Sequence, residues 1–278
     1  MTVTPAAVKE LRDKTGAGMM DCKKALVDAD GDMAKAEKLL KESGLAAAAK
    51  RMGRVTSEGR VFARLSGARG ALAELSCETD FVARNSDFVA LGGRIIDRLV
   101  ADGAGADAAA LEAMVKDTAG IIKENMALRR FKVIDAASGE MLVDYIHGEG
   151  RIGVILRFRL PNAALASDPR VKETTFDLAL HVAAFAPAYL SRDRVDPAYI
   201  GEQEAIFRKQ VEGMDKPENV LAGIVKGKVA KHLSEICLLE QGFVKDEKVK
   251  VSKVLEDLGK KVGGKVDLLE YLYFKVGQ

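Results

Sequence analysis

Residues 59–77 read GRVFARLSGARGALAELSC, and this stretch decides the fold of the chain. Apolar side chains recur at every second position from Val61 to Leu65, which is the period of a β-strand. The glycine-rich residues 67–70 then predict a tight turn, and residues 71–77 predict a second strand. The stretch therefore predicts an antiparallel β-hairpin.

Helical periodicity follows the hairpin. A helix is predicted over residues 80–100, where large apolar side chains recur at helical spacing, namely Phe81, Phe88, Leu91, Ile95 and Leu99. A loop over 101–107 precedes a second helical stretch that runs to Leu128. Alternation returns over 130–134, so a further strand is predicted there.

The same order of elements recurs later in the chain. Residues 141–147 and 152–160 predict a second hairpin around a turn at Gly148–Gly150. A helix is predicted over 171–185 and a closing strand over 268–276. Two copies of hairpin, helix and returning strand predict an α+β fold with a duplicated core of two small antiparallel sheets.

Two helical parts accompany this core. At the N-terminus, the Thr4-Pro5 entry and breaks near Gly16 and Gly31 predict three short helices, the last ending at Gly44 as a C-cap. Two amphipathic helices joined by 214–219 predict an antiparallel helical hairpin. The predicted division is a three-helix domain at 1–45, a basic linker at 46–58, core subdomains at 59–140 and at 141–190 with 241–278, and the hairpin insertion at 191–240.

Charge and composition restrict the function. The chain has 43 basic and 41 acidic residues, a net charge of +2. A non-specific nucleic-acid binder usually carries a basic domain or stripe, because its affinity comes largely from phosphate neutralisation. The basic run is short, and its simplest interpretation is a solvated linker; it consists of Lys50, Arg51, Arg54 and Arg60. No specific nucleic-acid partner is expected.

The cysteines and the apolar runs predict a cellular compartment. Cys22, Cys77 and Cys237 are few, odd in number and far apart, which favours free thiols and a reducing environment. The N-terminal residues lack the pattern of a signal peptide, and no apolar run reaches the roughly 18 residues of a membrane-spanning helix. A cytoplasmic protein is expected.

No constellation of catalytic residues is visible. The nearest match to a phosphate-binding loop, Gly223–Lys228, has the wrong spacing and lies in a helical pattern. The histidines, His147, His181 and His232, lack metal-like spacing to other ligands. Cys77 has no cationic neighbour in the adjoining sequence to activate its thiol. We therefore expect no enzyme, no cofactor, no metal site and no nucleotide site of the chain's own.

Several segments carry a family resemblance, in the right order and through most of the chain. They are LRDKTGAGMMDCKKAL at 11–26, CETDFVAR at 77–84, ENM at 124–126 with Arg129-Arg130, YIHG at 145–148 with RIGV at 151–154, and HVAA at 181–184 with Pro187. This set closely resembles elongation factor Ts. The resemblance implies a ubiquitin-associated-like N-terminal domain, a core of two subdomains and a coiled-coil insertion.

The resemblance also implies a function. Family members bind elongation factor Tu, a translational GTPase, in its GDP form, speed the release of GDP and leave when GTP enters. The implied result is a disturbed Mg²⁺ and phosphate site on the partner. A homodimer or a 2:2 complex is left open.

The segment Thr79-Asp80-Phe81-Val82, called the tip below, is the predicted centre of this activity. From periodicity alone, Asp80 is a helix N-cap and Phe81 is the first core residue of its helix. The resemblance instead implies that Phe81 is an apolar wedge against the partner near its metal ion. It also implies that Asp80, supported by the helix dipole, binds partner groups without ligating the ion.

Further partner contacts are carried over at single positions. Met19 and Met20 lie about 100° apart around a helix, so both cannot face the core of the domain and one is expected to be exposed. With Arg12 and Lys23, they resemble the N-terminal docking surface. Ile122 is a candidate contact for which core packing is an equal alternative, and His147 and Val244 resemble further contacts.

The sequence differs from the family pattern in two places, and one alternative function is considered. The sequence ends at Gln278, so the C-terminal helical module of some members is expected to be missing. The charged Lys245 also departs from the family's more apolar pattern, which weakens the transfer near Val244. The alternative function is an RNA- or ribosome-binding module, whose binding would weaken steeply with salt.

Overall fold

The computed structural model describes residues 3–278, so the first two residues of the predicted N-terminal domain lie outside it. The described residues form two compact units. The first holds the chain up to Ile134 together with Ile146–Gly153 and Phe274–Gln278, and the second holds Asp135–Tyr145 and Val154–Tyr273. The predicted five-part division stays a prediction.

The predicted first hairpin is confirmed in the first unit. Strands β1 (Glu58–Ser66) and β2 (Arg69–Cys77) pair antiparallel, with Ser66 opposite Arg69 and Glu58 opposite Cys77. Strand β3 (Met126–Asp135) completes a sheet of order β1-β2-β3. Because β2 is the central strand, it is almost wholly buried.

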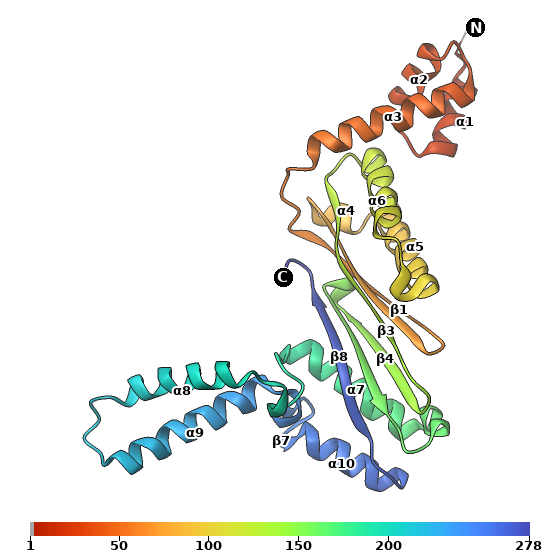
Figure 1. Ribbon diagram of the computed structural model, residues 1–278. Helices are drawn as coiled ribbons and strands as arrows, with labels where there is room; N and C mark the ends of the chain where they lie inside the picture. Colours follow the sequence, from red (N-terminus) through yellow and green to blue (C-terminus); the bar gives the residue numbers. More distant parts are fainter. Residues whose placement is uncertain (1–2) are drawn as a thin grey trace. The chain divides into compact units, whose positions relative to one another are not determined.

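Helices α5 (Ser86–Asp102) and α6 (Ala108–Ile122) form the core of the first unit with this sheet (Figure 1). Gly92 allows α5 to approach β1, because a Cβ there would lie 2.1 Å from the ring of Phe62. The fully buried side chains that bring helices and sheet together are Leu75, Phe88, Leu91, Ile95 and Leu99.

The limits of the two helical stretches that follow the hairpin were predicted wrongly. The helix expected over 80–100 is divided into α4 (Asp80–Ala83) and α5, because the Asn85 side chain accepts a hydrogen bond from the Asp87 amide and caps a new helix. The stretch expected to reach Leu128 ends at Ile122, since Lys123 adopts a left-handed conformation with φ of 68°.

The three N-terminal helices are α1 (Pro5–Thr15), α2 (Met19–Asp28) and α3 (Met33–Arg51). Thr4 caps α1 as predicted, accepting a hydrogen bond from the Ala7 amide at 3.2 Å. Their small shared core consists of Val8, Leu11, Cys22, Ala25, Leu26, Ala29 and Ala36.

The predicted end of α3 at Gly44 is wrong, and the helix continues through the first part of the expected linker. Gly44 faces Gly120 of α6, where a Cβ on Gly120 would lie 3.0 Å from the carbonyl carbon of Gly44. The glycine therefore permits close packing of two helices rather than a C-cap.

The second sheet repeats the topology of the first. Strands β4 (Glu140–His147), β5 (Ile152–Arg159) and β8 (Asp267–Lys275) have the order β4-β5-β8, again a hairpin whose second strand lies beside the returning strand. Helices α7 (Pro169–Phe185) and α10 (Val251–Val262) pack against each other in the second unit. The fold is α+β, and the predicted duplication is confirmed.

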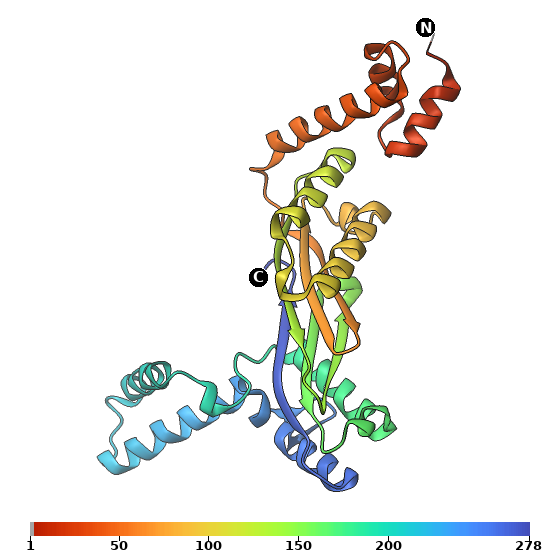
Figure 2. The same cartoon turned by 45° about the vertical axis from the view of Figure 1, so that its right-hand side comes forward.

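The insertion is the predicted antiparallel pair of helices, α8 (Pro197–Val211) and α9 (Glu218–Ile236), which lie side by side in Figures 1 and 2. Val211 of α8 belongs to the same buried apolar cluster as Val225, Val229 and Leu233 of α9. The near-match to a phosphate loop, Gly223–Lys228, lies inside α9.

Several smaller elements were not predicted. They are α10 (Val251–Val262), strands β6 (Gly242–Phe243) and β7 (Asp246–Lys250), and short 3-10 turns at Ala163–Ser167, Arg192–Arg194 and Leu238–Glu240. The predicted turn at Gly148–Gly150 and the predicted loop around Gly103–Gly105 each contain a short 3-10 turn. Among residues 3–278, no helix combines the length and the apolar character needed to cross a membrane.

Candidate functional site

The tip forms one turn of helix between β2 and α5. Thr79, not Asp80 as predicted, is the N-cap of α4, and its hydroxyl accepts a hydrogen bond from the Val82 amide at 3.3 Å. Phe81 is 83% exposed, whereas its neighbour Val82 packs against the core of the unit. The interpretation of Phe81 as a core residue is therefore wrong. Because α4 has four residues, its dipole offers Asp80 less support than the predicted long helix would have done.

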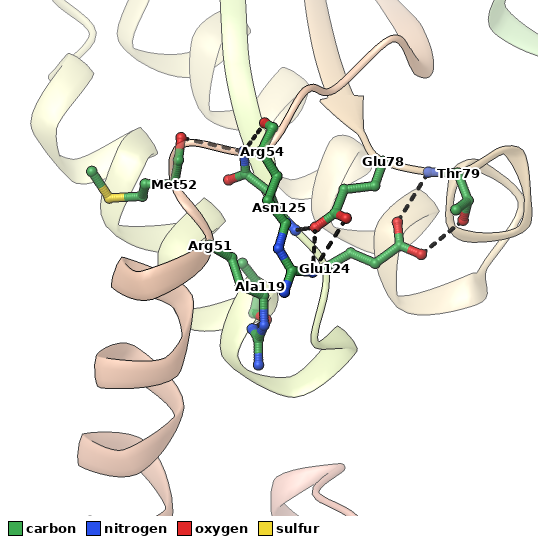
Figure 3. A network of polar contacts seen from close by, with 8 residues as sticks. All are labelled: Arg51, Met52, Arg54, Glu78, Thr79, Ala119, Glu124 and Asn125. Carbon is green, nitrogen blue, oxygen red and sulfur yellow. Dashed lines mark hydrogen bonds and ion pairs between the residues drawn. The ribbon is translucent and has the colours of Figure 1, made fainter.

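Two carboxylates hold the start of the tip (Figure 3). Glu124 accepts hydrogen bonds from the Thr79 amide at 3.1 Å and from the Thr79 hydroxyl at 2.8 Å. Glu78 accepts one from the Asn125 amide at 2.6 Å, and this amide, helped by the Arg54 guanidinium, lowers the pKa of Glu78. The tip is thus tied on its N-terminal side to the connection between α6 and β3.

Charged side chains hold the other side of the tip. Arg60 of β1 donates a hydrogen bond to the Ala83 carbonyl at 2.6 Å. Glu149, in the turn after β4, lies 3.8 Å from the Arg60 guanidinium and 3.6 Å from that of Arg84. Arg84 in turn lies 4.0 Å from the Asp80 carboxylate. The backbone of the tip is held from both ends while the Phe81 ring projects into solvent.

Sequence reasoning gave no role to Glu78, Glu124, Arg60 or Glu149. One signal was available for Glu78 and Glu124, because both lie in segments that resemble the family, at 77–84 and at 124–126. A contact between residues 45 positions apart, such as Thr79 with Glu124, cannot be read from spacing.

The Cys77 thiol beside the tip is unsuited to nucleophilic chemistry. Its side chain is fully buried, and its sulfur lies 3.2 Å from the Thr79 carbonyl oxygen. Burial, followed by the nearby Glu124 and Glu58 carboxylates, raises the pKa of Cys77 to about 12. A thiolate, which is the nucleophilic form, is therefore scarce at neutral pH.

The predicted docking residues on α1 and α2 are all exposed. Met20 is 73% exposed and Met19 is 46% exposed, so both methionines, rather than one, face solvent. Arg12 and Lys23 are exposed as well. Asp21, between them, forms an ion pair of 2.7 Å with Lys123. This pair links the start of α2 to the connection that holds the tip.

Ile122 and His147 differ in their surroundings. Ile122 is half-buried and packs against the core of the first unit, which favours the core alternative. His147 is exposed at the end of β4, two residues before Glu149. The turn that follows His147 therefore reaches the tip through Glu149.

Val244 lies in the second unit, where two α7 residues hold its segment. The Val244 amide donates a hydrogen bond of 3.1 Å to Nδ1 of His181, so Nε2 of His181 carries the proton that it donates to Gln241. Lys245 forms an ion pair of 2.6 Å with Asp177. The charged residue that departs from the family pattern thus has a local partner.

The buried His181 predicts a pH dependence of stability in the second unit. Burial lowers the pKa of His181 below its ordinary value of 6.5, because desolvation disfavours the imidazolium ion. The unfolded chain then binds the proton more tightly than the folded chain. The free energy of unfolding is therefore expected to fall as the pH drops below 6.5, until the lowered pKa is passed.

A His181→Gln variant is expected to lose this part of the pH dependence, because glutamine can accept the Val244 hydrogen bond but does not titrate. Urea unfolding of both proteins at pH 7 and at pH 5 checks this. An equal loss of stability in the two proteins would contradict it.

The basic run of the expected linker is largely occupied within the protein. Arg51 donates a hydrogen bond to the Ala119 carbonyl at 3.5 Å, Arg54 contacts Glu78, and Arg60 contacts Ala83. These arginines do not form a free basic stripe, so the feature that motivated an RNA-binding module does not support it.

Comparisons with known proteins identify the family of the chain. The family model described as elongation factor TS matches residues 78–278. The elongation factor Ts of Borrelia hermsii is 48% identical over 278 residues, covering the whole of both chains. That of Treponema denticola is 46% identical over 277 residues, covering 100% of this chain and 99% of its own. The chain therefore belongs to the elongation factor Ts family of translation factors.

Proposed function

We propose that this protein binds elongation factor Tu in its GDP form and accelerates the release of GDP, so that GTP can bind. The observation that carries the proposal is Phe81, a large apolar side chain left 83% exposed on a backbone that is hydrogen-bonded on both sides. An exposed apolar ring on a fixed support is suited to insertion into a partner. Membership of the elongation factor Ts family supports the identity of that partner.

The physical basis is a coupling between two binding events. A GTPase holds GDP and Mg²⁺ through a phosphate loop, a hydroxyl group and carboxylates. If Phe81 enters the partner only when those contacts are disturbed, burial of its ring contributes about 1.5–3 kcal/mol to the disturbed state. Nucleotide and exchange factor then weaken each other's binding by the same ratio. No covalent step is required of this chain.

The other predicted contacts are assigned to docking. Met19 and Met20 offer adaptable apolar contacts, with Arg12 and Lys23 beside them. Asp80 and Thr79 bind partner groups around the wedge. Val82 anchors the tip by packing against the core of the first unit. His147 and Val244 are further contacts, whereas Ile122 supports the core on which the tip rests.

The test is release of fluorescent GDP from a preformed complex with elongation factor Tu, in an excess of unlabelled nucleotide. Substoichiometric amounts of the protein are expected to accelerate release over many turnovers. If release is not accelerated over a broad range of concentrations, the proposal is rejected.

A further inference from the structure

Three consecutive residues between α6 and β3 each hold a different part of the first unit. They are Lys123, Glu124 and Asn125, called the bracket below. Lys123 ends α6 in a left-handed conformation and pairs with Asp21 at the start of α2. Asn125 donates hydrogen bonds from its side chain to the Arg54 carbonyl at 2.7 Å and the Met52 carbonyl at 3.4 Å, just after α3.

Glu124 makes the contact that acts on the tip (Figure 3). Its two carboxylate oxygens accept from the amide and the hydroxyl of Thr79. A hydroxyl group has one proton, so donation to Glu124 leaves the lone pairs of Thr79 for the Val82 amide. Glu124 therefore orients both the backbone and the side chain of the α4 N-cap.

The tip needs such external support because α4 is only four residues long. A helix of this length is not stable by itself, since its first turn is entropically unfavourable. Phe81 adds no core contact of its own, being 83% exposed. The direction of its ring thus depends on the groups that hold Thr79 on one side and Ala83 on the other.

We propose that Glu124 is a positioning residue for Phe81, acting through the N-cap of α4. This inference rests on the proposed function, in which Phe81 is the wedge. It assigns Glu124 a role in exchange without contact to the partner. The Asp21–Lys123 pair of the bracket is exposed and therefore contributes little to stability.

The experiment is a double-mutant cycle on maximal GDP release from elongation factor Tu. Glu124→Ala is expected to lower the maximal rate about tenfold, the factor for loss of one charge-assisted hydrogen bond, with the half-saturating concentration changed less than about twofold. In a Phe81→Ala background, Glu124→Ala is expected to have less than about a twofold further effect, because its role passes through Phe81.

Two further variants complete the design. Glu112→Ala removes a carboxylate of α6 that forms an exposed ion pair of 3.7 Å with Lys116, and it is expected to leave exchange unchanged. Glu124→Gln keeps the volume and one acceptor oxygen, so an intermediate rate is expected. It also replaces Glu124→Ala if that variant does not fold.

Amide hydrogen exchange of Thr79 and Val82 gives a readout that does not depend on the partner. Faster exchange at both amides is expected in the Glu124 variants, with the β2 amides unchanged. Unaltered exchange at Thr79 and Val82, or equal effects of Glu124→Ala with and without Phe81, would overturn the inference. If the parent protein does not accelerate GDP release, the proposed function fails, while hydrogen exchange still decides whether Glu124 positions the tip.

Discussion

Replacing Phe81 with alanine is expected to lower the maximal rate of GDP release from elongation factor Tu roughly 10- to 150-fold. This range corresponds to losing the burial of one phenylalanine side chain, about 1.5–3 kcal/mol, in the state that releases nucleotide. The free energy of unfolding is expected to change by less than about 0.5 kcal/mol, because the ring is 83% exposed and lies outside the core.

The measurement combines exchange kinetics with urea unfolding of the same protein samples. Val55→Ala is a matched control, since Val55 is 82% exposed in the same unit but lies outside the tip. Its exchange rate and stability are expected to equal those of the parent protein. A Phe81→Ala variant that folds normally and exchanges at the parental rate would refute the wedge role.

Among the variants proposed for this protein, Glu74→Ala is expected to lower the free energy of unfolding most, by about 3 kcal/mol. The Glu74 carboxylate in β2 is 2% exposed and accepts hydrogen bonds from Arg130 at 2.7 Å and from the Gly277 amide at 2.9 Å. Arg130 also donates to the Lys275 carbonyl and stacks over Phe274 at 4.4 Å. Removing Glu74 leaves a partly buried guanidinium and a backbone amide without their carboxylate.

Equilibrium unfolding in urea at neutral pH checks this prediction. The control is Asp97→Ala, which removes an ion pair with Arg64 of 3.0 Å whose partners are both about half exposed. It is expected to cost less than about 1 kcal/mol, because exposed ion pairs contribute little. Equal losses in the two variants would contradict the assignment of Glu74 as a buried anchor.

The sequence predicts some elements of the structure better than others. Alternation predicted the hairpin of β1 and β2 well, because one buried face requires the two-residue period. Helix limits were predicted less well, because a glycine can either end a helix or allow two helices to pack closely. Gly44 was expected to end α3, but it lets α3 and α6 approach, which depends on a residue 76 positions away.

Helix α10 shows a signal that was present and not used. Val251, Leu255 and Leu258 recur at helical spacing and are buried. The adjoining Lys245 was interpreted only as a departure from the family pattern, whereas its ion pair with Asp177 explains its charge. The helical spacing of α10 can be read from the sequence, whereas the partner of Lys245 is set by the tertiary structure.

The sequence likewise predicted only part of the candidate site. The identity of the tip, and its place between a strand and a helix, followed from the sequence, because local periodicity and the ordered family segments are local properties of the chain. Periodicity alone placed Phe81 in the core, and only the tertiary structure decided that the ring faces solvent while Val82 packs inward.

By itself, the sequence determined the α+β class, the repeated order of elements and the family, since these depend on short-range patterns and on segment order. Only the tertiary structure decided what holds the tip: Glu124 on Thr79, Arg60 on Ala83 and Glu149 near Arg84. These contacts join residues far apart in the chain. Their geometry depends on how helices and strands pack, which no local pattern encodes.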